Sequence, residues 1–287
     1  MTCYGPYGNP GCGTIFKIDA KGVFTLLHTF TGAPSDGALP STGGGMVLDG
    51  SGNLYGTTGF GGAYNGGVVF KITPSGQYSL LYSFGGVSGD AVGPNQQMLL
   101  IGNELYGTSE AGGSSGYGSI FKISLQGSES VLFSFGQSDG ANPTAPLIAD
   151  PSGNLYGTTE GGSVFEVTPS GKETVLYSFG GGSDGEEPAA GLSWDNAGNL
   201  YGTTWMGGTG TNPNCTGGCG TIFKLSNSGG TWTKTTVHSF DQTDGSLPES
   251  VLLLYKGSFY GTTLAGGTST CNYPNDTGCG VVFKLTP

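Results

Sequence analysis

Short apolar or aromatic runs, separated by turn residues, recur along the whole chain. Four kinds of run follow one another in a fixed order, exemplified by Met46–Asp49, Leu54–Thr58, Gly67–Lys71 and Leu81–Phe84, and the set repeats at roughly 45–60 residues. The runs are rich in Val, Ile, Thr, Tyr and Phe and are bounded by Gly, Asn or Asp, which predicts short antiparallel strands. Helical periodicity is absent from the sequence. Four strands per repeat predict an all-β fold of the β-propeller class.

The number of repeats predicts a single β-propeller domain that spans residues 1–287. The repeat units cover approximately residues 13–58, 67–109, 118–159, 162–204 and 220–263, with residues 280–287 closing the ring. The Phe-Lys run occurs six times and each other run five times. We therefore expect about five four-stranded blades closed by both termini, with one strand to spare. A ring of six blades, or a fragment of a larger propeller, is the alternative.

The order of strands within a blade follows from a resemblance. Residues 192–201, Leu-Ser-Trp-Asp-Asn-Ala-Gly-Asn-Leu-Tyr, resemble the strand–turn–strand segment of NHL-type propellers. That resemblance implies that the apolar run ending in Asp is innermost and that the Leu-Tyr strand is second. The Phe-Lys strand would then be third, and the Tyr-Ser-Phe strand outermost.

The repeat as a whole resembles the Gloeo_Verruco, or GloVer, tandem repeat of bacterial exported proteins. The residues that carry the resemblance are Gly52–Thr58, Gly67–Lys71 and Leu81–Phe84, and the pattern recurs five times over nearly the whole chain. The resemblance implies an extracellular or cell-surface protein, although we see neither the export signal nor the C-terminal anchor of such proteins. It implies no established activity, so no catalytic residue is carried over.

Composition and charge exclude several classes of function. The formal net charge is −11, and all nine basic residues are lysines. The chain therefore lacks the arginine that grips phosphate in a bidentate manner, and we expect no nucleic-acid partner. The apolar runs are no longer than strands, so we expect no membrane span.

Six cysteines fall into three pairs in equivalent loops of the repeat. The pairs are Cys3/Cys12, Cys215/Cys219 and Cys271/Cys279. An even number of cysteines in matched loops predicts three local disulfides in an oxidising compartment. Free thiols, or thiolates that converge on zinc, are the alternatives.

The repeated Asp-Gly turns offer the few candidate metal ligands. Four aspartates each precede a proline by four residues: Asp36, Asp139, Asp184 and Asp244. Turn formation explains them, so we expect no cofactor, with calcium as the alternative. The histidines His28 and His238 occupy a strand position that holds Tyr or Phe in other repeats, and we interpret them as structural.

The residues that follow each Leu-Tyr-Gly strand break the repeat and offer the best candidate ligand site. We expect Phe60, Glu110, Glu160, Trp205 and Met206 to lie on one face, with the Trp and Phe exposed. Aromatic rings and carboxylates together suit a sugar. The same two glutamates, Glu110 and Glu160, are the candidates for acid–base catalysis. Glu186 and Glu187 are interpreted as loop surface charge.

These observations predict a non-catalytic extracellular or cell-surface binding and display module. We expect a monomer whose partner is a polysaccharide or cell-surface glycan. A propeller glycoside hydrolase or polysaccharide lyase is the first alternative, and a purely structural repeat spacer is the second.

Overall fold

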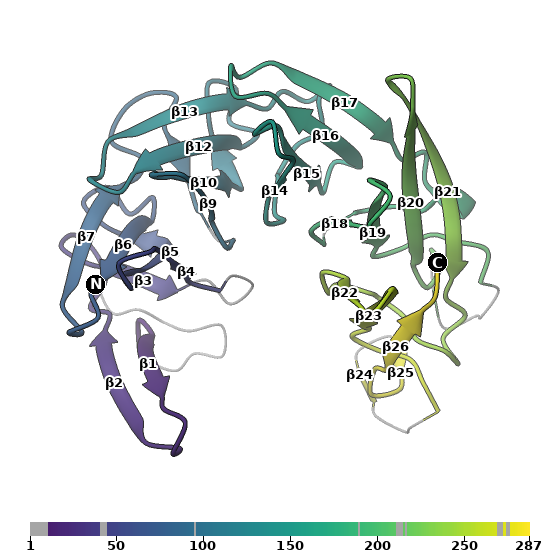
Figure 1. The fold of residues 1–287 in the computed structure, drawn as a ribbon, viewed down its shortest axis with the longest axis horizontal. Helices are drawn as coiled ribbons and strands as arrows, with labels where there is room; N and C mark the ends of the chain where they lie inside the picture. The colour runs from purple at the N-terminus through teal and green to yellow at the C-terminus, as the bar shows by residue number, and fades with distance from the viewer. Residues whose placement is uncertain are drawn as a thin grey trace. The chain divides into compact units, whose positions relative to one another are not determined.

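The computed structural model describes residues 11–40, 45–94, 96–188, 190–210, 215, 217–268, 272–273 and 276–287. Within them the chain is built of short β-strands and a single short 3-10 helix, η1 (Gly182–Asp184) (Figure 1). None of the described helical segments is long and apolar enough to cross a membrane. The chain forms two compact units. The first comprises residues 1–138, 142–147 and 169–171, and the second comprises residues 139–141, 148–168 and 172–287.

The first unit contains a two-stranded sheet followed by two larger antiparallel sheets. The two-stranded sheet pairs β1 with β2, the next sheet contains β3 to β7, and the third has the order β9-β10-β12-β13, while β8 pairs with β11. The strands are β1 (Thr14–Ile18), β2 (Phe24–Thr29), β3 (Gly37–Pro40), β4 (Val47–Leu48), β5 (Leu54–Gly61), β6 (Val68–Ile72), β7 (Tyr78–Ser83), β8 (Ala91–Val92), β9 (Leu99–Ile101), β10 (Glu104–Ser109), β11 (Ala111–Gly112), β12 (Ser119–Ser124) and β13 (Glu129–Ser134).

The second unit contains two four-stranded antiparallel sheets and one of three strands. Their orders are β14-β15-β16-β17, β18-β19-β20-β21 and β22-β23-β26, and β24 pairs with β25. The strands are β14 (Ile148–Ala149), β15 (Leu155–Thr159), β16 (Ser163–Val167), β17 (Glu173–Ser178), β18 (Ser193–Trp194), β19 (Leu200–Thr204), β20 (Thr221–Ser228), β21 (Thr231–Ser239), β22 (Leu253–Tyr255), β23 (Ser258–Thr262), β24 (Asn272–Tyr273), β25 (Asp276–Thr277) and β26 (Val282–Leu285).

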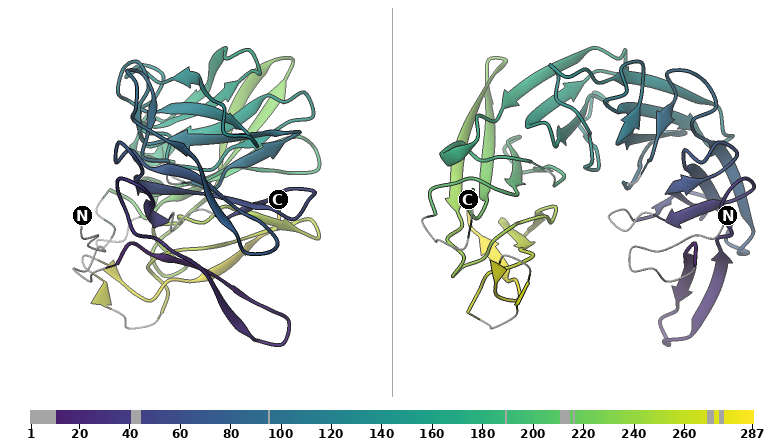
Figure 2. Two further views of the ribbon diagram at one scale, coloured as in Figure 1. Left: turned by 90° about the vertical axis from the view of Figure 1, so that its left-hand side faces the viewer. Right: turned by 180° about the vertical axis from the view of Figure 1, so that it is seen from behind.

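The sheets confirm the predicted all-β class and the predicted order of strands. In each complete sheet the short apolar strand pairs with the Leu-Tyr strand, which pairs with the Phe-Lys strand, which pairs with the Tyr-Ser-Phe strand. Figure 2 shows the consecutive strands of each sheet side by side from two further directions. The register between the Phe-Lys strand and the Tyr-Ser-Phe strand shifts immediately before the phenylalanine. Examples are the shifts between Val69 and Phe70 and between Ile222 and Phe223. A bulge at this point increases the local twist of each sheet.

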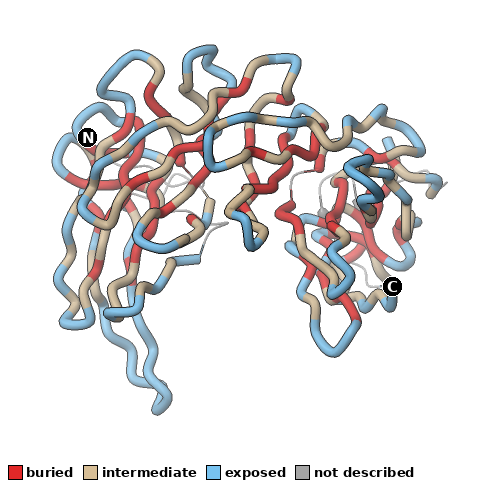
Figure 3. The backbone as a smooth tube through the Cα atoms, turned by 45° about the horizontal axis from the view of Figure 1, so that its top comes forward, coloured by how far each residue is buried: buried red, intermediate tan, exposed pale blue. Residues whose placement is uncertain are grey.

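The glycine of the Leu-Tyr-Gly motif is required because an aromatic ring of the neighbouring strand lies over it. Gly202 is the register partner of Phe223, as Gly56 is of Phe70 in the first unit. A Cβ atom at Gly202 would lie 2.5 Å from Phe223 Cζ, far inside van der Waals contact. The phenylalanine ring fills the space that a side chain would occupy, and it is fully buried. Figure 3 shows the resulting pattern, with buried strand segments and exposed turns.

Among the described residues, the first and last sheets have fewer than four strands. The β1–β2 sheet consists of the third and fourth kinds of strand, and the β22–β23–β26 sheet of the first three kinds. Phe16 and Ile18 are 50% and 61% exposed, whereas the equivalent Phe70 and Ile72 are 2% and 1% exposed. Val282 of β26 is likewise 80% exposed. The fold is therefore β-propeller-like, while the expected five-blade closure stays a prediction.

The cysteines among the described residues are all oxidised. Cys215 and Cys219 form the predicted disulfide, with Cα atoms 5.1 Å apart. Cys12 and Cys279 are also disulfide-bonded. Their predicted partners, Cys3 and Cys271, lie outside the described residues, so those two pairings stay predictions.

Candidate functional site

Five aspartates occupy the same place in the repeat, and we call them the turn aspartates. Each lies four residues before a proline, and they are Asp36, Asp90, Asp139, Asp184 and Asp244. They do more than form their own turns. Asp36 accepts hydrogen bonds from Tyr78 Oη at 2.7 Å and from the Thr31 and Gly37 amides at 2.9 and 2.8 Å. Since Tyr78 belongs to β7, this carboxylate joins two neighbouring sheets.

The partners of Asp36 also determine its ionisation. Burial alone would raise the pKa of Asp36, but the hydrogen bonds from Tyr78, Thr31, His28 and Gly37 outweigh burial and hold the pKa below its usual value. His28 Nε2 lies 3.0 Å from Asp36 Oδ2, and its ring stacks on the Tyr78 ring with centroids 3.6 Å apart. His28 lies on strand β2, as predicted, with a carboxylate and an aromatic ring as its partners.

Two further turn aspartates also have a basic partner. Asp184 accepts a hydrogen bond from Lys234 Nζ at 2.8 Å and one from Tyr177 Oη at 2.7 Å. His238 Nε2 lies 2.7 Å from Asp244 Oδ2, which repeats the arrangement of His28 and Asp36. Both basic side chains come from β21, the fourth strand of its sheet, and the Asp184 carboxylate balances the charge of Lys234.

The two remaining turn aspartates have a glutamate where a basic or phenolic side chain lies elsewhere. Asp90 interacts with Glu129 of β13, and Asp139 interacts with Glu173 of β17. Burial, and then repulsion by Asp90, raises the pKa of Glu129 to about 7, although a hydrogen bond from Tyr82 acts in the opposite direction. Burial and repulsion by Asp139 raise the pKa of Glu173 to about 7. These carboxyl groups therefore destabilise the fold when they ionise.

The E129Q variant is expected to be more stable than the wild type at pH 8 in EDTA, by about 1–2 kcal/mol after screening by solvent. The folded-state pKa is about 7 and the usual value is 4.5, so wild-type stability falls as the pH rises from 4.5 to above 7. Urea unfolding at pH 5 and pH 8 measures the effect, and E129Q should lose less stability between these pH values. Equal losses in both proteins would contradict the raised pKa.

The predicted calcium ligands receive no direct support. Among the residues that the structure describes, no group of three or more His, Cys, Asp or Glu side chains could hold a metal ion. The carboxylates of Asp36 and Asp184 are hydrogen-bonded by side chains and amides of the protein. Calcium at Asp36, Asp139, Asp184 or Asp244 stays an untested prediction.

The second unit brings three of the predicted ligand-binding residues to one place. Trp205 N–H donates to the Glu187 carbonyl at 2.9 Å, and Met206 and Glu186 exchange backbone hydrogen bonds at 3.0 and 3.2 Å. The charges of Glu186 and Glu160 both act on Glu187. Burial, followed by these two charges, raises the pKa of Glu187. We call Glu160, Glu186, Glu187 and Trp205 the acidic patch.

Within the acidic patch the tryptophan differs from expectation. Trp205 is partly buried rather than exposed, and its indole Nε1 is buried without a hydrogen-bond partner in the described structure. Glu160 and Glu186 are exposed. Glu187 differs from the loop surface charge that the sequence predicts, because it is partly buried and its carbonyl is bonded to Trp205. The patch therefore combines a partly buried indole ring with three carboxylates that can accept hydrogen bonds from hydroxyl groups.

The backbone that carries the patch is left-handed at one residue. Glu187 has φ = 55°, and the residues at the same position of other repeats have similar values: Leu39 at 54°, Gly93 at 69°, Asn142 at 57° and Leu247 at 55°. A non-glycine residue in this region costs about 1–3 kcal/mol, so the surrounding turn must enforce it. The enforced conformation directs the Glu187 carbonyl to the Trp205 amide.

The first unit presents the other two predicted residues in the equivalent position. Phe60, on β5, is 54% exposed and is the register partner of Ala38. Glu110 is exposed, and its amide donates to the Gly93 carbonyl at 3.3 Å. Glu110, Glu160 and Trp205 follow a Leu-Tyr-Gly strand, whereas Phe60 lies near the end of the longer strand β5. The prediction that they share one face of a ring stays untested, as does catalysis by Glu110 or Glu160.

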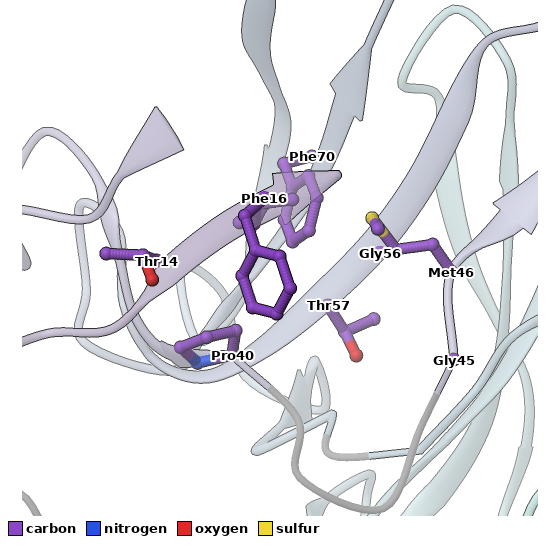
Figure 4. Close-up of a pocket in the computed structure, with 9 residues that line it drawn as sticks. Thr14, Phe16, Pro40, Gly45, Met46, Gly56, Thr57 and Phe70 are labelled. Carbon is purple, nitrogen blue, oxygen red and sulfur yellow. The ribbon is translucent and has the colours of Figure 1, made fainter. Parts of the chain in front are cut away.

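A cavity of about 300 Å³ lies in the first unit beside β1. Figure 4 shows Phe16, Met46 and Phe70 around it, with Thr14 and Thr57 as the polar side chains. The Thr57 hydroxyl donates to the Gln96 carbonyl at 3.3 Å. The lining includes no titratable side chain, and none of the predicted ligand-binding residues lies in it.

Comparison with known proteins identifies the repeat. The profile of the Gloeobacter/Verrucomicrobia repeat matches residues 1–213 and 160–287. None of the curated proteins matches the chain. Among solved structures, the extracellular domain of a protein described as the hybrid two-component system BT4673 of B. thetaiotaomicron is similar over 92% of this chain and 33% of that chain, with a TM-score of 0.53 and 13% identity. YCF48 bound to D1 peptide is similar over 87% and 68%, with a TM-score of 0.52 and 14% identity. At these identities the likeness shows the fold alone.

Proposed function

Because this chain belongs to the Gloeobacter/Verrucomicrobia repeat family, we propose that it is a non-catalytic extracellular or cell-surface binding module whose ligand is a carbohydrate. The acidic patch carries the proposal. The partly exposed Trp205 indole offers an apolar face, and carboxylates accept hydrogen bonds from hydroxyl groups. A sugar ring presents an apolar face and a rim of hydroxyls, so it complements both kinds of side chain.

Two observations support the extracellular setting within this proposal. The disulfide between Cys215 and Cys219 suits an oxidising compartment. One of the similar structures is an extracellular domain. The proposal includes a monomeric ring of five blades, because the first sheet supplies the third and fourth kinds of strand and the last sheet supplies the first three kinds.

The wild-type protein is expected to be retained on an immobilised polysaccharide and to release no product from it. Isothermal titration against a panel of neutral and acidic oligosaccharides measures the affinity. The W205A variant should weaken binding at least tenfold, because a tryptophan at the centre of a site commonly supplies much of the binding energy. The matched control is Y255A, which removes an exposed aromatic ring outside the patch and should bind as the wild type does.

The other outcomes distinguish the alternatives. Released oligosaccharide that disappears in E110Q or E160Q would replace the binding module with a hydrolase or lyase. Retention that is equal in the wild type and W205A would place the site elsewhere on the protein. Failure to bind any polysaccharide would leave the structural spacer as the function.

A further inference from the structure

The turn aspartates divide into two classes according to the charge beside them. Among the described residues, Lys234 forms an ion pair with Asp184, and the histidines His28 and His238 each place Nε2 within hydrogen-bond distance of Asp36 and Asp244. Asp90 and Asp139 instead interact with Glu129 and Glu173. The repeat thus places a basic side chain beside three turn aspartates and a second carboxylate beside two.

Lys234 shows that this part of the repeat accommodates a cation. It lies within β21 at the position equivalent to Glu129 of β13, because Lys234 pairs with Leu225 as Glu129 pairs with Ile123. The Lys234 side chain is 5% exposed. Its Nζ donates to Asp184 Oδ1 at 2.8 Å, to the Asp184 carbonyl at 2.5 Å and to Thr236 Oγ1 at 2.7 Å. The ammonium group is therefore surrounded by oxygen atoms.

The Asp90–Glu129 pair has the oxygen atoms but lacks the positive charge. Asp90 is 5% exposed, and its Oδ2 accepts hydrogen bonds from Gly85 N at 2.8 Å, Gly86 N at 3.1 Å and Tyr82 Oη at 3.3 Å. Asp90 Oδ1 and Glu129 Oε1 are buried and have no hydrogen-bond partner among the residues that the structure describes. The Tyr82 hydroxyl interacts with both carboxylates. Buried carboxylate oxygens without a partner are costly, so this arrangement invites a ligand.

We propose that the Asp90–Glu129 pair binds a divalent cation, with calcium as the preferred ion. Asp90 Oδ1 and Glu129 Oε1 would bind it directly, the Tyr82 hydroxyl oxygen would lie within its reach, and water would complete the shell. Two carboxylates balance the charge of a divalent ion. Calcium accepts irregular shells of oxygen ligands, whereas magnesium requires a near-ideal octahedron. The ion would take the role that the Lys234 ammonium group has beside Asp184.

The test compares thermal unfolding of the full chain in EDTA and in millimolar CaCl₂ at pH 7.5. Binding to the folded state alone raises the wild-type midpoint, and EDTA should reverse the rise. Two variants remove the site in different ways. E129Q removes one ligand charge, and E129K copies the Asp184–Lys234 arrangement. Both variants should show a smaller calcium-dependent rise of the unfolding midpoint. In EDTA, the E129K variant should have a higher unfolding midpoint than the wild type.

The control is E104Q, which neutralises a partly buried glutamate elsewhere on the same sheet and should keep the full calcium-dependent rise. A rise of equal size in the wild type, E129Q and E129K would overturn the proposal. So would the absence of any response of the wild type to CaCl₂ at pH 7.5. If stability in that case still climbs on acidification, the pair binds a proton rather than a metal ion.

Discussion

The D36A variant is expected to lose about 3–4 kcal/mol of unfolding free energy. Removal of the Asp36 carboxylate from a buried network leaves its hydrogen-bond donors without an acceptor. Asp36 is 6% exposed. Its two oxygens satisfy Tyr78, Thr31, Gly37 and His28, which all lose their acceptor in the variant. The network joins β2 to β7 through the turn before β3, so its loss weakens the contact between the first two sheets.

Urea unfolding of the wild type, D36A and D19A at pH 7 measures this effect. Asp19 is a matched control, because its carboxylate also caps a turn, accepting from the Lys21 and Val23 amides, but at an exposed site. D19A should cost no more than about 1 kcal/mol. Since the pKa of Asp36 is lowered, its contribution persists at neutral pH and fades as the pH falls below the usual value of 3.8. A loss in D36A as small as that in D19A would show that the network contributes little.

The second large effect is expected in the G202V variant, which should lose about 3 kcal/mol of unfolding free energy through overpacking. The new Cβ would lie 2.5 Å from Phe223 Cζ and 3.1 Å from Leu192 Cδ2. Both side chains are buried, so neither has solvent into which it can move. Thermal unfolding and circular dichroism should show a lower midpoint with an unchanged β-sheet signal.

A matched variant separates the clash from the general effect of the substitution. Gly59 also belongs to such a strand, but a Cβ atom there would meet nothing within 4 Å. G59V should change stability by less than about 0.5 kcal/mol. In a double-mutant cycle, G202V should cost less in an F223L background, because the smaller side chain frees the space. Equal costs in the two backgrounds would mean that Phe223 is not the obstacle.

The sequence could predict the sheets because each strand carries its own signal. Alternating apolar residues, turn residues at fixed positions and the repetition of both determine the strand order of every complete sheet. The sequence could not predict in the same way how the first and last sheets are packed. The same Phe-Lys pattern describes Phe16, which is half exposed, and Phe70, which is buried, because burial depends on the neighbouring sheet.

The site was predicted less completely, for a physical reason. The strand-following position located Glu160 and Trp205, but Glu187 joins them through a backbone hydrogen bond from a different turn. Asp90 carries a weaker sequence signal because alanine follows it instead of glycine, although its spacing to Pro94 matches that of the other turn aspartates. Glu129 and Glu173 carry no local signal, since their environment is created by a partner in another strand or turn.

The left-handed residue that follows the turn aspartates and precedes their proline affects which substitutions the neighbouring loop tolerates. Trp205 and Leu264 are held by carbonyl groups of Glu187 and Leu247, at 2.9 and 3.0 Å, and no side chain takes part in either bond. Their side chains can therefore be exchanged without removing the bond that positions them. The side chains at these positions can therefore vary while the backbone hydrogen bonds that stabilise the turns are kept. The chain is consequently a natural starting point for libraries of engineered binders, with one pair of randomised positions in each repeat.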